Sequence, residues 1–404
     1  MTQTPGGSRW LRRALIIAGI VALAVNLRGP ISGVGPVLDL LTNQLSLSAL
    51  EVSVLAATPV LCFGIFGVLT PQITARLGLD ATAALALIVL SGGLLLRSAG
   101  MVSALFAGTI LISAAIAVGN VLLPVLVKRD APRHPGLMTG AYTTTLTTSA
   151  AIGAAITVPL SSAYTWQIGL GVWLLTAALA LVLWAPRAAD ARTQRKNDTS
   201  VAASSGRIGP LLTVPLAWQV TIFFGMQSAT FYAVLAWLPS IFAEAGIEAS
   251  DAGLLLAVTT LSGIPMALMI PAWAARCADQ RFFPLGLAAL SISGFLGLLI
   301  APSAIPVLWA MLIGFGMGGS FPLVLTLIVL RTATASDTSA LSTMSQGLGY
   351  LIAAALGPLT LGVLHDATGA WTWPVIALIA LSVPQAITGW ASGRAMLIGH
   401  TENV

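Results

Sequence analysis

Long apolar runs, separated by short polar stretches, recur along the whole chain. Each run has roughly 20 residues or more, the length that an α-helix needs to cross a bilayer. Ser48 and Glu51 have the spacing of a capping box at the start of the second run. The pattern predicts an all-α integral membrane protein of twelve transmembrane helices, near residues 14–40, 49–70, 81–98, 101–127, 137–160, 165–185, 214–239, 252–273, 283–301, 305–330, 339–362 and 372–392.

One connection differs from the others in length and composition. Residues 186–209 are polar, rich in Ser and Ala and mixed in charge, which is typical of a flexible linker. We expect this linker to lie in the cytoplasm. It divides the chain into an N-terminal bundle of six helices over residues 1–185 and a C-terminal bundle of six over residues 210–404.

The two halves resemble each other in sequence. A shift of 200 residues places Pro71 on Pro271 and Arg76 on Arg276, as two of six identities. Together with the twelve spans and the central linker, these identities predict two parallel pseudo-repeats. Transporters built from such repeats hold their substrate at the interface of the repeats, near the bilayer midplane.

Composition agrees with a membrane protein. The chain is 57% hydrophobic and 8% charged, whereas a soluble domain carries about 25% charged residues. The net charge of +5 does not indicate nucleic-acid binding, because the basic residues follow the loops. With both termini inside, the inward loops and tails hold 16 of the 18 Lys and Arg residues. The remaining two are Arg97, in an outward loop, and Arg28. We therefore expect a multi-pass protein of the bacterial inner membrane with cytoplasmic termini.

Several kinds of chemistry lack a sequence signature. Cys62 falls within a span and Cys277 in a loop, so they do not read as a redox pair, and the three His residues lie in loops or the tail. Cys and His residues do not have metal-ligand spacing. The chain also lacks a nucleotide-binding loop and a nucleophile elbow. We expect no cofactor, no metal and no enzyme activity.

Arg28 is the one charged residue that the pattern places deep inside a span. It lies about 21 Å along a helix from the basic pair Arg12-Arg13, near the middle of the bilayer. Asn26-Leu27-Arg28-Gly29-Pro30 should interrupt the first span, because Pro30 removes a backbone donor. Asn26 and the freed carbonyls would hydrate the guanidinium. A charge at this depth marks a substrate site by default, although it could instead tie the first span to a neighbouring helix.

Further polar residues within the spans are candidates for orienting a bound solute, because amide and phenol groups donate and accept hydrogen bonds. Each of them could equally serve packing between helices. Tyr142 belongs to a hydroxyl stripe, and Gln346 and Tyr350 lie one turn apart on one face. The candidate substrate-binding residues beside Arg28 are Asn26, Asn120, Tyr142, Gln227, Tyr232, Gln346 and Tyr350.

These motifs resemble a known family. The chain is similar to the major facilitator superfamily and, within it, to the cyanate transporter and nitroimidazole exporter (CynX/NimT-like) group. One departure is Pro71, where the superfamily usually has an acid, so the intracellular latch of that loop does not carry over. The resembling stretches are Asn26–Pro30, Thr58–Gly64, Gly119–Pro124 with Lys128–Asp130, Phe231–Pro239, Gly318–Pro322 with Arg331-Thr332, and Gly347–Tyr350 followed by Gly357-Pro358.

The resemblance implies secondary active transport of a small solute by alternating access. The first hypothesis is a small anion or an electron-rich polar solute, cyanate-like, attracted by Arg28. The alternative is efflux of neutral nitroheterocyclic or drug-like compounds. A hypothesis of another class is a membrane sensor that binds a ligand without moving it. The expected partners are an anionic or nitro-bearing small molecule and the lipid bilayer, without nucleic acid, and the expected state is a monomer.

Overall fold

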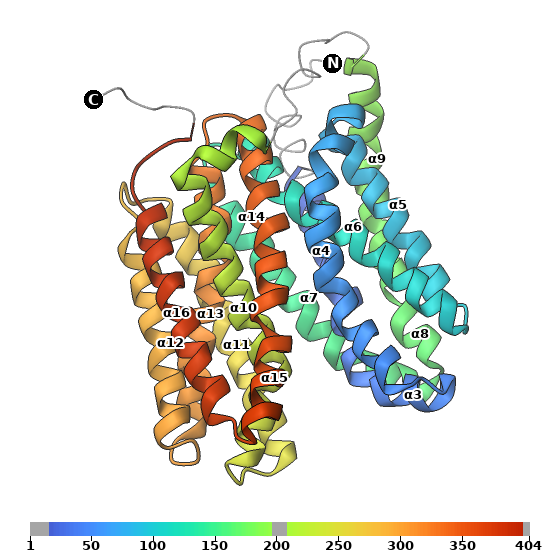
Figure 1. Ribbon diagram of the computed structural model, residues 1–404. Helices are drawn as coiled ribbons and strands as arrows, with labels where there is room; N and C mark the ends of the chain where they lie inside the picture. The colour runs from blue at the N-terminus through green and yellow to red at the C-terminus, as the bar shows by residue number, and fades with distance from the viewer. Residues whose placement is uncertain (1–15, 196–207, 399–404) are drawn as a thin grey trace, which may run out of the picture. The chain divides into compact units, whose positions relative to one another are not determined.

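A computed structural model describes residues 16–195 and 208–398, and these residues are almost entirely helical (Figure 1). The described part of the chain contains twelve helical segments long and apolar enough to cross a membrane. The predicted all-α class and the twelve spans are therefore confirmed. The basic pair Arg12-Arg13, His400 and part of the expected linker lie outside the described residues.

Several helices extend beyond the predicted apolar runs. The second to sixth spans are α4 (Ala49–Leu77), α5 (Leu79–Arg97), α6 (Val102–Asp130), α7 (Pro135–Ala163) and the pair α8 (Trp166–Gly171) and α9 (Trp173–Arg195). After η3 (Gly209–Thr213) come α10 (Pro215–Glu244), α11 (Ala249–Ala274), α12 (Phe282–Ile300), α13 (Pro306–Leu330), α14 (Ala335–Leu356) with α15 (Pro358–Thr368), and α16 (Thr372–Ser392).

The first span is broken where the sequence predicts. Residues 16–25 are helical, residues 26–28 form a turn, and the chain continues as α2 (Gly29–Ser32), η1 (Gly35–Val37) and α3 (Leu38–Leu45). Pro30 sits at the start of α2, where the missing N–H costs nothing because a first-turn N–H has no partner inside the helix. The break therefore follows from local sequence.

The described residues divide into two compact units. Residues 16–130 and 145–195 form the first unit, and residues 131–144 and 208–398 form the second. The first turns of α7 thus pack with the second unit, which differs from the expected division at the linker. Gly136 and Gly140 permit this packing, because a Cβ there would lie 2.2 Å from the Pro271 carbonyl oxygen and 2.7 Å from that of Leu268 on α11.

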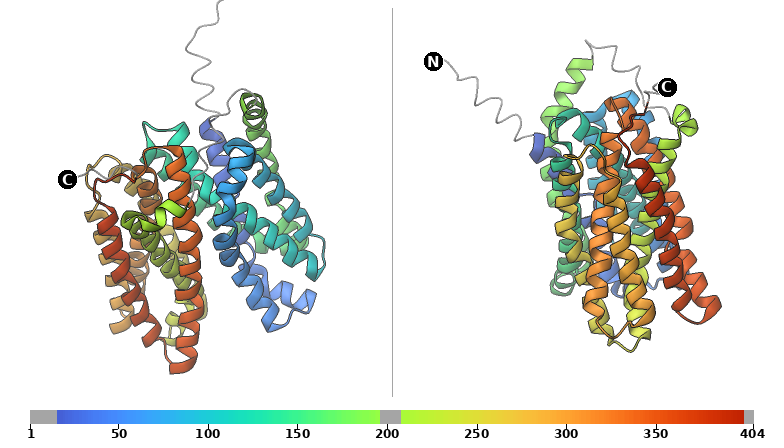
Figure 2. Two further views of the ribbon diagram at one scale, coloured as in Figure 1. Left: turned by 45° about the horizontal axis from the view of Figure 1, so that its top comes forward. Right: turned by 90° about the vertical axis from the view of Figure 1, so that its left-hand side faces the viewer.

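The packing of helices repeats between the units. In the first unit α6 packs against α4 and α5, and α5 packs against α9. In the second, the corresponding spans do the same: α13 packs against α11 and α12, and α12 packs against α16. Figure 2 shows α12, α13 and α16 side by side from two further directions. The pseudo-repeat read from the sequence is present in three dimensions.

The capping box of the second span is confirmed. The Ser48 hydroxyl accepts a hydrogen bond from the Glu51 N–H, and Glu51 Oε2 accepts one from the Ser48 N–H at 2.8 Å. These bonds from the Ser48 backbone and hydroxyl lower the pKa of the Glu51 carboxyl. The capping box therefore fixes the residue at which α4 begins.

Candidate functional site

Arg28 stands at the break in the first span. It is half-buried and directly precedes α2, whereas the two residues on either side of it are buried. Its carbonyl oxygen accepts hydrogen bonds from the Ser32 N–H and the Ser32 hydroxyl, both at 3.0 Å. The side chain is thus partly exposed at the turn, and the backbone carbonyl of Arg28 is hydrogen-bonded.

Glycine residues bring the surrounding helices close to this turn. A Cβ on Gly29 would lie 2.2 Å from the ring of Trp173 on α9, and one on Gly119 of α6 would lie 2.6 Å from Leu27. Asn120, the residue after Gly119, is buried with 5% exposure. Leu27, the neighbour of Arg28, thus packs against Gly119, the neighbour of Asn120 on α6.

The side chain of Asn26 is hydrogen-bonded to other residues of the protein. Its amide Nδ2 donates to the Ala22 carbonyl at 2.8 Å and to the Thr176 carbonyl at 3.2 Å, and its Oδ1 accepts from the Thr176 hydroxyl at 2.8 Å. The side chain is fully buried. Asn26 therefore joins the turn to α9, which holds the segment around Arg28 in place.

Arg97 does not lie in an outward loop, as the sequence analysis expected. It ends α5 and is fully buried. Its guanidinium donates to the Pro30 carbonyl at 2.8 Å and to the Leu170 carbonyl at 3.1 Å. Arg97 thus binds a backbone carbonyl two residues after Arg28. The apolar pattern of the sequence could not show these hydrogen bonds, because the two acceptors lie 67 and 73 residues from Arg97 along the chain.

The other candidates belong to the second unit. Tyr142 and Tyr350 are each 1% exposed, and Tyr350 makes ring contacts with Tyr232. Gln346 Nε2 donates to the Ser342 hydroxyl at 2.9 Å, and Gln227 Oε1 accepts from the Ser228 hydroxyl at 3.3 Å. The spans of this unit therefore present a neutral, aromatic and amide-bearing set, in contrast to the cationic turn of the first unit.

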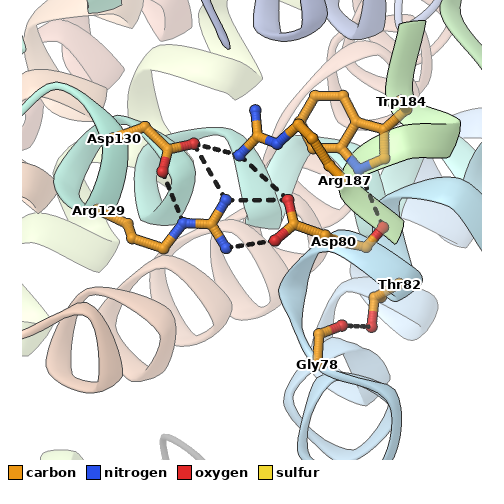
Figure 3. A network of polar contacts seen from close by, with 7 residues as sticks. All are labelled: Gly78, Asp80, Thr82, Arg129, Asp130, Trp184 and Arg187. Atoms are coloured by element: carbon orange, nitrogen blue, oxygen red, sulfur yellow. Dashed lines mark hydrogen bonds and ion pairs between the residues drawn. The ribbon is translucent and has the colours of Figure 1, made fainter. Parts of the chain in front are cut away.

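Four charged residues form an ionic cluster that the sequence analysis missed (Figure 3). Arg129, near the end of α6, pairs with Asp80 at 2.7 Å and with its neighbour Asp130 at 2.7 Å. Arg187 of α9 pairs with the same two carboxylates, at 3.1 Å to Asp80 and 2.5 Å to Asp130. Its guanidinium lies 4.3 Å from the ring centroid of Trp184. Arg187 was expected in the linker, but α9 continues through Pro186 to Arg195.

The second unit has a counterpart in which an amide and backbone carbonyls accept the hydrogen bonds of the arginine. Arg331, directly after α13, donates to Gln280, to the Ser392 carbonyl at 2.8 Å and to the Gly393 carbonyl at 3.0 Å. Gln280 stands 200 residues after Asp80, the same shift that relates the two halves. In both units an arginine at the end of the fourth span thus binds the residue before or at the start of the third.

Comparison with known proteins agrees with this architecture. Residues 14–354 match the Major Facilitator Superfamily. Among solved structures, the proton:xylose symporter XylE superposes with a TM-score of 0.75, at 13% identity, over 95% of this chain and 97% of that one. At such low identity this match shows the fold alone.

Three curated relatives match over nearly the whole chain. The uncharacterized transporter YycB of Bacillus subtilis (strain 168) is 38% identical over 96% of this chain and 95% of its own length. The 2-nitroimidazole transporter of Escherichia coli (strain K12) is 37% identical over 95% and 96%. The cyanate transport protein CynX of the same strain is 29% identical over 90% and 94%. The chain is therefore a multi-pass membrane transporter that belongs to the major facilitator superfamily, in the group of the cyanate and 2-nitroimidazole transporters.

Proposed function

We propose that the protein is a secondary active transporter that moves a small anion or an electron-rich polar solute across the bacterial inner membrane by alternating access. The observation that carries this proposal is the position of Arg28. It stands half-buried at a break in the middle of the first span, and a charge at that depth is retained only where it serves a site or a partner.

Arg28 would supply the attraction for the solute. A guanidinium presents its N–H donors in a planar fork, which matches the paired oxygens of a nitro or carboxyl group. Within the first unit, Asn26 would act through Arg28 by holding the turn, because its amide is bound to Thr176. Asn120 would contact the solute from α6. In this proposal, the contacts between the turn and its neighbouring helices serve to hold Arg28 in position.

The second unit would orient the solute through neutral groups. The proposed contacts are the hydroxyl groups of Tyr142, Tyr232 and Tyr350 and the amides of Gln227 and Gln346. Amides and phenols supply directed hydrogen bonds without a second charge. A neutral set is compatible with both a monovalent anion and an uncharged polar solute.

A second candidate is efflux of a neutral nitroheterocyclic or drug-like compound. It is favoured by the relative named as a 2-nitroimidazole transporter, which matches at 37% identity over 95% of this chain. The relative named as a cyanate transport protein favours the first candidate, because cyanate is a small anion. The direction of flux under a defined gradient separates uptake from efflux.

Thermal unfolding of the purified protein tests the site. A solute that binds the folded state raises the midpoint by mass action, so cyanate or 2-nitroimidazole should stabilise the wild type in a concentration-dependent way. Arg28→Ala should remove that shift, and Arg28→Lys should leave part of it, because lysine keeps the charge without the fork. Arg133→Ala, at an exposed position, is the matched control and should bind as the wild type does. An Arg28→Ala protein that binds as tightly as the wild type refutes the assignment.

A further inference from the structure

Two arginine side chains lie over one tryptophan ring at one end of the second unit. The Cζ atom of Arg281, which directly precedes α12, lies 5.5 Å from the ring centroid of Trp390 on α16, and that of Arg394 lies 5.1 Å from the same centroid. Both distances are those of a cation–π contact. Arg281 and Trp390 are half-buried and Arg394 is exposed. These three side chains form a partly open surface, the Arg–Trp patch.

Backbone packing brings the two arginines together from distant parts of the sequence. The Gln280 N–H donates to the Gly393 carbonyl at 2.9 Å, and a Cβ on Gly393 would lie 2.7 Å from the Cα of Arg281. Arg331 donates to the Gln280 side chain and, at 3.0 Å, to the Gly393 carbonyl. Arg331 thus binds the residues directly before Arg281 and Arg394. The patch is therefore part of the packed fold, although its side chains face outward.

The first unit contains a similar contact whose charge is neutralised. Arg187 lies 4.3 Å from the ring centroid of Trp184 on α9, the last helix of the sixth span, as α16 is of the twelfth. That arginine also pairs with the carboxylates of Asp80 and Asp130. Its guanidinium is therefore held between an indole ring and two anions that the protein itself supplies.

The Arg–Trp patch has less negative charge than its positive charge requires. Asp279 Oδ2 lies 2.9 Å from Arg281 Nε, and Asp279 Oδ1 accepts from the Arg281 backbone N–H at 2.9 Å. Within residues 16–195 and 208–398, the terminal nitrogens of Arg281 and the guanidinium of Arg394 make no hydrogen bond. Two cations thus face one carboxylate, and their outer N–H groups are available to an anion from outside the chain.

The surroundings of the patch indicate which anion fits. It lies at the ends of α12 and α16, which are side by side (Figure 1). Trp and basic residues at the ends of spans lie at the level of the lipid headgroups. Phe282 and Met396 follow the two arginines closely in the sequence and are 78% and 53% exposed. Acyl chains cover such apolar side chains, whereas a soluble anion leaves them in water.

We propose that the Arg–Trp patch binds the headgroup of an anionic phospholipid. The phosphate accepts hydrogen bonds from the outer nitrogens of Arg281 and Arg394, because guanidinium and phosphate match as a charged, bidentate pair. The acyl chains lie along Phe282 and the apolar surface of α12. Basic residues at the ends of spans bind anionic headgroups by the same chemistry. This site uses none of the residues assigned to the transported solute.

Two phospholipids with identical chains test the proposal. The full chain in detergent is titrated with dioleoylphosphatidylglycerol and with dioleoylphosphatidylcholine, and thermal stabilisation gives an apparent Kd for each lipid. The wild type should bind phosphatidylglycerol at least about tenfold more tightly. Arg281→Gln and Arg394→Gln should each weaken phosphatidylglycerol about fivefold, which corresponds to about 1 kcal/mol per basic residue, and leave phosphatidylcholine unchanged. The double variant should show no preference.

A matched control separates a built site from general surface charge. Arg76→Gln combined with Arg133→Gln removes two exposed arginines outside the patch and should keep the preference. Equal binding of the two lipids by the wild type overturns the proposal. So does a preference that survives in the double variant of the patch, or one that falls equally in the control.

A third probe distinguishes a lipid from a soluble phosphate compound. Glycerophosphoglycerol carries the headgroup of phosphatidylglycerol without its acyl chains. It should not stabilise the wild type at the concentrations at which the lipid does, because the contacts with Phe282 and α12 are missing. Stabilisation equal to that by phosphatidylglycerol would show that the patch binds a soluble phosphodiester, and would contradict the assignment to a lipid.

Discussion

At the scale of single residues, the polar side chains around the broken first span divide into two roles. Arg28 is half-buried at the turn, whereas Asn26 and Arg97 are fully buried and bonded to neighbouring helices. Asn26 and Arg97 use carbonyl and hydroxyl partners on α2, α8 and α9. Buried polar groups of this kind hold the turn in one geometry, and that geometry is what places Arg28.

The bond between Asn26 and Thr176 is the first testable consequence. A double-mutant cycle with Asn26→Ala and Thr176→Val should give a coupling of about 1 kcal/mol in the free energy of unfolding, the usual size for a hydrogen bond between membrane helices. Asn26→Ala combined with Thr368→Val, whose hydroxyl bonds within its own helix in the other unit, should be additive. Additivity in the first pair would remove Asn26 from the proposed positioning role.

The sequence showed the existence of these residues but not their partners. Arg28 was found because a charge inside a long apolar run is visible in one dimension. Arg97 was misplaced because it lies at the end of its apolar run. At that position the sequence does not distinguish the buried end of a helix from the start of a loop. Arg187 was assigned to the linker because its charge and the nearby Pro186 outweighed the helical pattern. In each case the missing information is a contact between residues far apart in the chain.

At the scale of helices, glycine decides how closely the broken span packs. A Cβ on Gly29 would lie 2.2 Å from the Trp173 ring, but one on Gly35, beyond the same break, would have no heavy atom within 4 Å. The two positions lie six residues apart in the same broken span, and each begins a short helix. The turn of Arg28 is therefore clamped on the side of α9.

This difference gives a matched pair of variants. Gly29→Ala should destabilise the protein by about 1–3 kcal/mol, the range for overpacking a tight contact, whereas Gly35→Ala should be nearly neutral. In a Trp173→Leu background the additional cost of Gly29→Ala should fall, because the clashing ring is gone. The midpoint of thermal unfolding reports all four proteins. Equal midpoints for Gly29→Ala and Gly35→Ala would contradict the proposed clamp.

At the scale of the whole molecule, the two halves repeat one plan with different chemistry. Arg129 and Arg331 each end a fourth span and reach Asp80 and Gln280, which lie 200 residues apart. Six identities predicted this repeat, and the fold confirms it. The substitution of carboxylates by an amide and backbone carbonyls in the second half was not predictable, because it depends on which side chains meet.

The orientation of the chain can be tested with its own cysteines. Cys277 is exposed between α11 and α12, and Cys62 is buried within α4. If the termini are cytoplasmic, Cys277 faces the cytoplasm. A membrane-impermeant maleimide should then leave intact cells unlabelled and should label inverted membrane vesicles, and Cys277→Ser should abolish the signal. Labelling of Cys277 in intact cells would reverse the proposed orientation.

The central claim is that Arg28 attracts the transported solute, and flux through reconstituted protein tests it most directly. Initial rates of thiocyanate and 4-nitropyrazole entry into proteoliposomes are measured for the wild type, Arg28→Lys, Arg28→Ala and the control Arg133→Ala. The account predicts saturable flux of at least one solute in the wild type and the control, a reduced rate in Arg28→Lys, and no saturable flux in a folded Arg28→Ala protein. Wild-type rates in Arg28→Ala would contradict it.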